Sequence, residues 1–191
     1  MATAAVLTPE QLRALASPVR NEVYSRLRAL EKASAGDLGR ELGRSAEAVH
    51  YHLRELLRVG LIREAFRRPT QRKPESVFEP TADAVRLPDP RKSPKVAELN
   101  RRAVLAGLRM VMRGYDAASR RAARTRERHE PPAGRIHVVR LNVRLSEEDA
   151  REFFRRIEEL ARFADQRRAA EGAGTRLHWH SIVYPPGLDR G

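Results

Sequence analysis

The stretch SAGDLGRELGRSAEAVHYHLRELLRVGL, from Ser34 to Leu61, predicts two helices joined by a tight turn. Ser34 is a suitable N-cap for the first helix because Asp37, three residues later, completes a variant capping box. Gly43 is a suitable end for that helix. Ser45 can cap the second helix, which Gly60 would end. A short helix, a tight turn and a longer helix form the outline of a helix-turn-helix unit.

The second of these helices is expected to have two different faces. Its apolar stripe consists of residues at helical spacing, namely Val49, Leu53, Leu56 and Leu57. Four polar side chains lie nearly opposite on a helical wheel: Glu47, Tyr51, Arg54 and Arg58. A helix in the DNA major groove needs an apolar backing and an outer face of donors, acceptors and flat rings. We therefore expect the polar face, with His50 on its shoulder, to meet base edges. An ordinary helical core would explain the stripe but not this face.

Further elements are predicted on both sides of this unit. Residues 8–16 and 17–30 each begin with a cap residue and a proline, and both have apolar residues at helical spacing. LIREAF and SVFEP are extended segments, and RRPTQRKPE between them predicts a β-hairpin with a basic tip. The cations of this wing are expected on DNA phosphates, a solvated loop being the alternative; they are Arg67, Arg68, Arg72 and Lys73. The run to about Pro80 thus has the order of a winged helix-turn-helix.

The segments LASPVRNEVYSRL and AGDLGRELGRSAEAVHYHLRELLRVGLI, with the hairpin that follows, resemble the DNA-binding domain of ArsR-like winged-helix transcriptional regulators. The resemblance covers about the first 80 residues and depends on matching positions in the second helix, namely Ser45, Val49, His52, Leu53 and the VGLI ending. It implies a homodimer that binds operator DNA with the wing cations on phosphate and with four residues of the second helix: Glu47, His50, Tyr51 and Arg54.

The chain departs from the metal-sensing members of that family. Those relatives carry a cysteine pair where this chain has Ser34 and Gly36, and the sequence contains no cysteine. Thiolate sensing of metals is therefore excluded, as are disulfides and cysteine nucleophiles.

The rest of the chain predicts a dimerisation region. Proline-rich residues 83–94 are expected to be a linker, and residues 95–130 a long helix. An apolar stripe on that helix is expected to join two subunits: Val104, Leu108, Val111 and Tyr115. Residues 131–191 predict a strand, a helix and a strand, a βαβ module that strengthens the dimer or receives a signal from a small-molecule effector. With a DNA-binding domain at 1–82, the expected fold is α+β, mainly α.

Composition favours a nucleic-acid partner. The net charge is +13, and residues 81–134 hold 13 basic and 6 acidic side chains. Most of the basic residues are arginine, which suits phosphate and guanine contacts, although a bias in codon usage would give the same preference. The sequence lacks a basic leader with an apolar run and any segment of about 20 apolar residues, so we expect a cytoplasmic protein without a membrane partner.

The sequence gives little support for catalysis or metal binding. His50 and His52 are two apart on a helix and cannot share a metal. His137, His178 and His180 could form a zinc-type site only if their strand faces coincided, which we do not expect. Because neither a glycine-rich phosphate loop nor a nucleophile motif is present, we expect no enzyme activity and no cofactor.

These observations predict a sequence-specific regulator of transcription that binds double-stranded DNA as a homodimer. One alternative is an architectural or non-specific DNA-binding protein whose excess charge carries the affinity. Another is a protein-interaction module whose helix and wing contact a partner protein.

Overall fold

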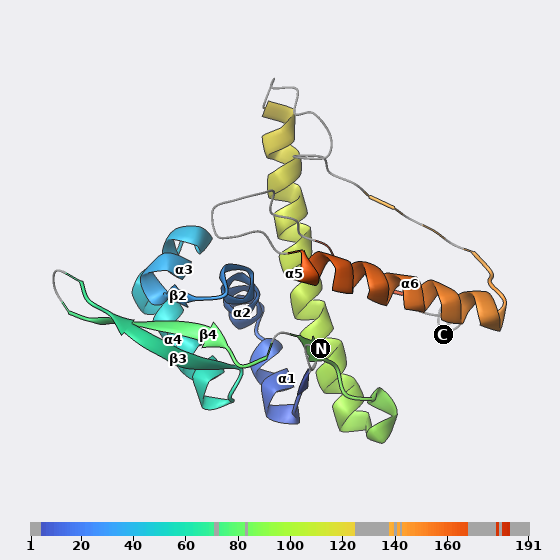
Figure 1. Ribbon diagram of the computed structural model, residues 1–191, viewed down its shortest axis with the longest axis horizontal. Coiled ribbons are helices and arrows are strands. Elements are labelled where there is room, and N and C mark those ends of the chain that lie inside the picture. The colour runs from blue at the N-terminus through green and yellow to red at the C-terminus, as the bar shows by residue number, and fades with distance from the viewer. Residues whose placement is uncertain are drawn as a thin grey trace. The chain divides into compact units, whose positions relative to one another are not determined.

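The computed structural model describes residues 5–70, 73–82, 84–124, 138–139, 141, 143–167, 179 and 181–183. Their fold is mainly helical with small sheets, as predicted (Figure 1). The chain divides into two compact units, Met1–Ala117 and Ala118–Gly191, and each is described by itself.

Four helices of the first unit lie where the sequence predicts them: α1 (Pro9–Leu15), α2 (Pro18–Leu30), α3 (Ala35–Leu42) and α4 (Ala46–Arg58). Their first turns explain the boundaries. Thr8 forms a capping box with Gln11 at the start of α1, and Ser34 forms one with Asp37 at the start of α3. Ser17 precedes α2 without a side-chain capping hydrogen bond, but Pro18 at the first helical position favours the helical φ.

The predicted hairpin is the core of a three-stranded antiparallel sheet. β3 (Ile62–Arg68) and β4 (Glu75–Pro80) pair from Ile62 opposite Pro80 to Arg68 opposite Glu75, with a bulge between Glu64 and Phe66. The sequence did not predict β2 (Ala33–Ser34), which pairs with the other edge of β4 just before α3 begins. The hairpin extends away from the helices as a wing (Figure 1).

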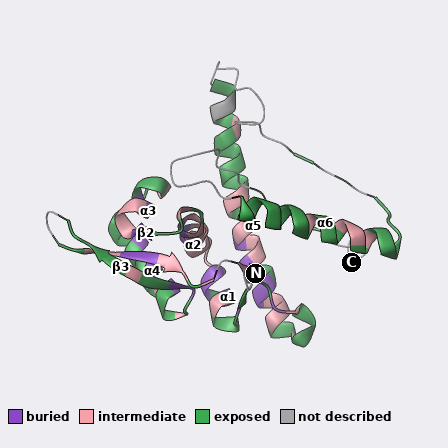
Figure 2. Cartoon of the chain, viewed as in Figure 1, coloured by how far each residue is buried: buried purple, intermediate pink, exposed green. Residues whose placement is uncertain are grey.

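The hydrophobic core lies between the helices and this sheet (Figure 2). Three residues of the α4 stripe are completely buried, namely Val49, Leu53 and Leu56. Burying a leucine side chain contributes about 1.5 to 3 kcal/mol, so this stripe fixes the rotation of α4 about its own axis. Leu57 is 41% exposed, and the prediction that it belongs to the buried stripe was wrong.

The segment expected to be a linker carries structure of its own. β5 (Val85–Arg86) pairs in parallel with β1 (Ala5–Val6), and a 3₁₀ turn, η1 (Pro90–Lys92), follows. The Nδ2 of Asn100 then donates to the carbonyl oxygen of Pro88 at 2.8 Å, which ties the segment to the next helix.

The long helix α5 (Pro94–Arg124) begins where predicted, and its N-terminal half packs on the core of the first unit. Leu99, Ala103 and Ala106 are buried, and the Nδ2 of Asn21 donates to the carbonyl oxygen of Ala103 at 3.4 Å. The stripe expected to join two subunits lies on a different side of the helix, roughly 140° from this buried face at 100° per residue. Residues 125–130 of the expected helix lie outside the described residues.

The second unit contains α6 (Glu147–Gln166), whose N-cap Ser146 accepts a hydrogen bond from the Asp149 backbone at 3.1 Å. The sequence predicted this helix and its cap. The flanking segments were expected to be strands, but residues 138–139, 141, 143–145, 179 and 181–183 are not in strands, and the others lie outside the described residues. Within the described ranges, no helix is both long and apolar enough to span a membrane.

Candidate nucleic-acid interface

The turn between α3 and α4 is held by a close backbone contact. The backbone nitrogen of Arg44 donates to the carbonyl oxygen of Gly39 at 2.9 Å, and Gly43 adopts a left-handed φ of 62°. A Cβ at Gly39 would lie 2.7 Å from the carbonyl oxygen of Arg44, so only glycine allows this approach. The hydroxyl of Ser45 then accepts from the Ala48 backbone at 3.2 Å and begins α4. The orientation of α4 against α3 is therefore fixed by the backbone.

The outer face of α4 projects into solvent. Its exposed side chains include the residues predicted to meet bases, namely Glu47, His50, Tyr51 and Arg54. Tyr51 is 61% exposed although it is a large aromatic residue. Arg54 makes no ion pair within the described ranges, whereas Arg58 is paired with Glu55 at 3.3 Å. On this face, the guanidinium of Arg54 is therefore the one that can bind an external acceptor without first breaking an ion pair among the described residues.

His52 lies between the outer face and the core. Its ring contacts Tyr51 edge to face, with ring centroids 5.2 Å apart. Its Nδ1 is buried and has no hydrogen-bond partner among the described residues. Burial, and then the positive charges of Arg20 and Arg44, lower the pKa of His52 below its ordinary value. His52 is therefore neutral at pH 7, and its ring packs edge to face against Tyr51.

The wing presents two of its predicted cations to solvent. The Arg67 side chain is 71% exposed, and its Nε donates to Glu64 at 3.0 Å. Lys73 is exposed at the tip, where its backbone nitrogen donates to the hydroxyl of Thr70 at 3.2 Å. Arg72 lies outside the described residues.

Arg68 differs from Arg67 because its guanidinium pairs with two carboxylates, one of them on α3. Its Nη2 lies 2.9 Å from Oδ2 of Asp37 and 3.4 Å from the hydroxyl of Ser34, and its Nε lies 2.8 Å from Oε1 of Glu75. The sequence showed Asp37 as a capping residue but not this partnership, which joins residues 31 positions apart. No local sequence signal indicates such a contact.

Burial raises the pKa of Asp37, but hydrogen bonds from the backbone and hydroxyl of Ser34, together with the charge of Arg68, lower it by more. The net pKa of Asp37 is below its ordinary value. The carboxylate is thus ionised at neutral pH and is matched to the guanidinium.

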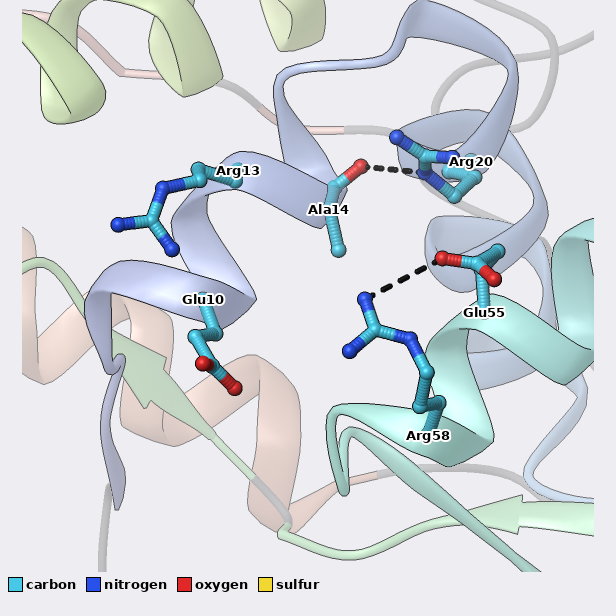
Figure 3. Close-up of a pocket in the computed structure, with 6 residues that line it drawn as sticks. All are labelled: Glu10, Arg13, Ala14, Arg20, Glu55 and Arg58. Carbon is cyan, nitrogen blue, oxygen red and sulfur yellow. Dashed lines mark hydrogen bonds and ion pairs between the residues drawn. The ribbon is translucent and has the colours of Figure 1, made fainter.

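One hollow of about 170 Å³ lies between α1, the start of α2 and the end of α4 (Figure 3). Its lining mixes both signs of charge: Glu10, Arg13, Ala14, Arg20, Glu55 and Arg58. Arg20 is held by a hydrogen bond from its Nε to the carbonyl oxygen of Ala14 at 2.8 Å. Because acidic and basic side chains both line the hollow, its charge does not favour either an anionic or a cationic ligand.

No cluster of three potential metal ligands occurs among the residues that the structure describes. The three histidines weighed in the sequence analysis as a zinc-type site lie outside the described residues; they are His137, His178 and His180. The helix α6 also carries two pairs of adjacent acidic residues, Glu147 with Glu148 and Glu158 with Glu159, and all four are exposed. Glu147 forms an ion pair with Arg151, and Glu159 forms one with Arg155, so they are surface charges.

Part of the chain matches a known helix-turn-helix domain family. The family model of a helix-turn-helix domain matches residues 15–65, which run from the last residue of α1 into β3. No curated protein matches the chain. The match includes all of α3, α4 and the turn between them, and the β3–β4 hairpin follows it as a wing.

Proposed function

We propose that this chain is an ArsR-like winged-helix regulator of transcription that binds double-stranded DNA sequence-specifically as a homodimer. The observation that carries the proposal is the division of α4 into a completely buried apolar stripe and a solvent-exposed polar face. Because the core packing of its apolar stripe fixes the orientation of α4, the helix can present its polar side chains to base edges in the major groove.

The proposed contacts follow the position of each side chain. Tyr51 and Arg54 would read bases from the centre of α4, flanked by Glu47 and His50. Arginine can donate two hydrogen bonds to guanine, and such a bidentate pair discriminates between bases by about 1 to 3 kcal/mol. Ser45 would lie at the start of α4 beside the DNA, and Arg58 at its other end.

The wing is proposed to contact the phosphate backbone. Arg67 and Lys73 are exposed near its tip, and Arg72 is between them in sequence. Such contacts position the protein on the duplex and do not depend on sequence.

The homodimer is proposed from the long helix. Val104, Leu108 and Val111 are only partly buried, and Tyr115 is 53% exposed. A two-fold partner packed on this stripe would place two copies of α4 about 34 Å apart, one turn of DNA, on a pseudo-palindromic operator.

The test is selection of a preferred duplex from a random pool, followed by affinity measurements on that duplex and on a scrambled one of equal composition at the same salt concentration. A regulator should prefer the selected duplex by about 10³-fold or more. Similar affinities for both would favour a non-specific DNA-binding protein, and no binding to either would favour a protein-interaction module.

A further inference from the structure

We propose that Arg68 is a positioning residue that fixes the tip end of the β3–β4 ladder to the first turn of α3, and that it is not itself a phosphate contact. This inference rests on the proposed function, because it assigns how the wing reaches the DNA backbone. It concerns the last residue of β3, immediately before the tip of the wing.

The contacts of Arg68 join three elements. Glu75 is the residue opposite Arg68 in the register of β3 and β4, so their ion pair closes the ladder at the base of the tip. Asp37 belongs to the first turn of α3, and its ion pair with Arg68 is 2.9 Å long. Ser34, whose hydroxyl is 3.4 Å from the same Nη2, is completely buried and caps α3. One guanidinium therefore links both strands of the wing to the helix that supports α4.

The charges at this point leave little attraction for phosphate. Arg68 is within ion-pair distance of two carboxylates, Asp37 and Glu75, and Asp37 also pairs with Arg40 at 2.5 Å. The Arg68 side chain is 45% exposed, and a phosphate that approached it would be repelled by both carboxylates. Arg67, with a side chain 71% exposed and one partner, is the better phosphate ligand on the neighbouring position.

A positioning role and a contact role make opposite predictions for Asp37. If Arg68 contacts phosphate, Asp37→Asn removes a competing negative charge, and binding to DNA should become tighter or stay unchanged. If Arg68 positions the wing, Asp37→Asn removes the charge from this ion pair, loosens the anchor and weakens binding, even though the protein has become more positive. Asparagine keeps a side-chain oxygen for the Ser34 backbone, so the capping hydrogen bond can persist.

The experiment measures binding of the full chain to its selected duplex over a range of salt concentrations for Arg68→Gln, Arg68→Lys and Asp37→Asn. Each phosphate contact contributes a salt slope of about 0.9 and about fivefold in affinity at roughly 0.15 M salt. A misplaced wing should lose two contacts or more, so Arg68→Gln should weaken binding about 30-fold and lower the slope by about 2. Arg68→Lys should restore part of this loss, because lysine can pair with one carboxylate but not bridge two.

The matched control is Arg63→Gln. Arg63 is also on β3 and pairs across the ladder with Glu79 at 2.7 Å, but among the described residues it forms no ion pair or hydrogen bond with α3. This variant should keep the slope of the wild type, and its amide exchange in β3 and β4 should stay slow where that of Arg68→Gln becomes faster.

A drop in slope of only about 1 for Arg68→Gln, together with unchanged or tighter binding by Asp37→Asn, would overturn the positioning role and leave the proposed function intact. Wild-type protein that binds no duplex at all would instead refute the proposed function.

Discussion

The carbonyl oxygen of Arg44 lies 2.7 Å from the point that a Cβ on Gly39 would occupy. This approach brings the turn against α3 and sets the angle at which α4 leaves it. Because the opposing atom belongs to the backbone, it cannot move aside as the end of a flexible side chain could.

Gly39→Ala should therefore destabilise the domain by about 1 to 3 kcal/mol, as is typical of overpacking. Chemical denaturation of the purified chain measures the change. Gly114→Ala is the matched control, since Gly114 is in α5 and a Cβ there would meet nothing within 4 Å. Alanine favours a helix more than glycine does, so the free energy of unfolding of the control should rise by about 0.5 to 1 kcal/mol. Equal effects of the two substitutions would show that the turn can relax.

His52 predicts a pH dependence of stability. Its pKa is lower in the folded protein than the ordinary value of 6.5, so the unfolded chain binds the proton more readily. The contribution of His52 to the free energy of unfolding is present above pH 6.5 and is lost as the pH falls through its folded pKa.

The measurement compares denaturant unfolding of the wild type and of His52→Gln at about pH 7.5 and about pH 5. The wild type should lose more stability between these pH values, because glutamine does not titrate. Carboxylates affect both proteins alike and cancel in the comparison. Equal losses would show that the neighbourhood of His52 accepts the protonated ring at no cost.

The exposed wing cations predict a salt dependence. Neutralising Arg67 and Lys73 together, as glutamines, should lower the salt slope of DNA binding by about 2 and weaken binding to all duplexes alike. Titrations at several salt concentrations on the selected and scrambled duplexes give both quantities. An unchanged slope would mean that the wing tip remains in solvent when the protein binds DNA.

Assembly can be tested on the stripe of α5. Leu108→Asp combined with Val111→Asp would place unpaired charge in the proposed subunit contact and should yield monomers with weaker operator binding. Arg109→Asp is a control that changes the net charge by the same two units at an exposed position of the same helix. Sedimentation at micromolar concentration measures the result. A wild-type monomer, or a double variant that remains dimeric, would remove this stripe from the interface.

Local signals explain why much of the fold could be predicted from sequence. The ends of α3 and α4 depend on residues within one turn, and the capping box of Ser34 with Asp37 is visible as a spacing of three. The stripe of Val49 and Leu53 likewise follows from helical periodicity. Such features need no knowledge of the rest of the chain.

Other features depend on contacts between distant segments and carry no local signal. The strands β1 and β5 have two residues each, and they form only because chain segments about 80 positions apart meet. Arg68 was predicted as a phosphate contact because it is a basic residue beside a turn, a pattern that cannot show Asp37 as its neighbour. Leu57 fits the helical stripe by periodicity, yet the core ends before it.

The central claim is that the outer face of α4 reads bases, and Arg54 tests it most directly because it is exposed and has no ion-pair partner within the described ranges. The decisive measurement is the affinity of Arg54→Ala for the selected duplex and for the scrambled duplex at one salt concentration. We predict a loss of about 1 to 3 kcal/mol on the selected duplex and a much smaller loss on the scrambled one. Equal losses on both would show that Arg54 contacts phosphate, and would contradict the claim that this face reads sequence.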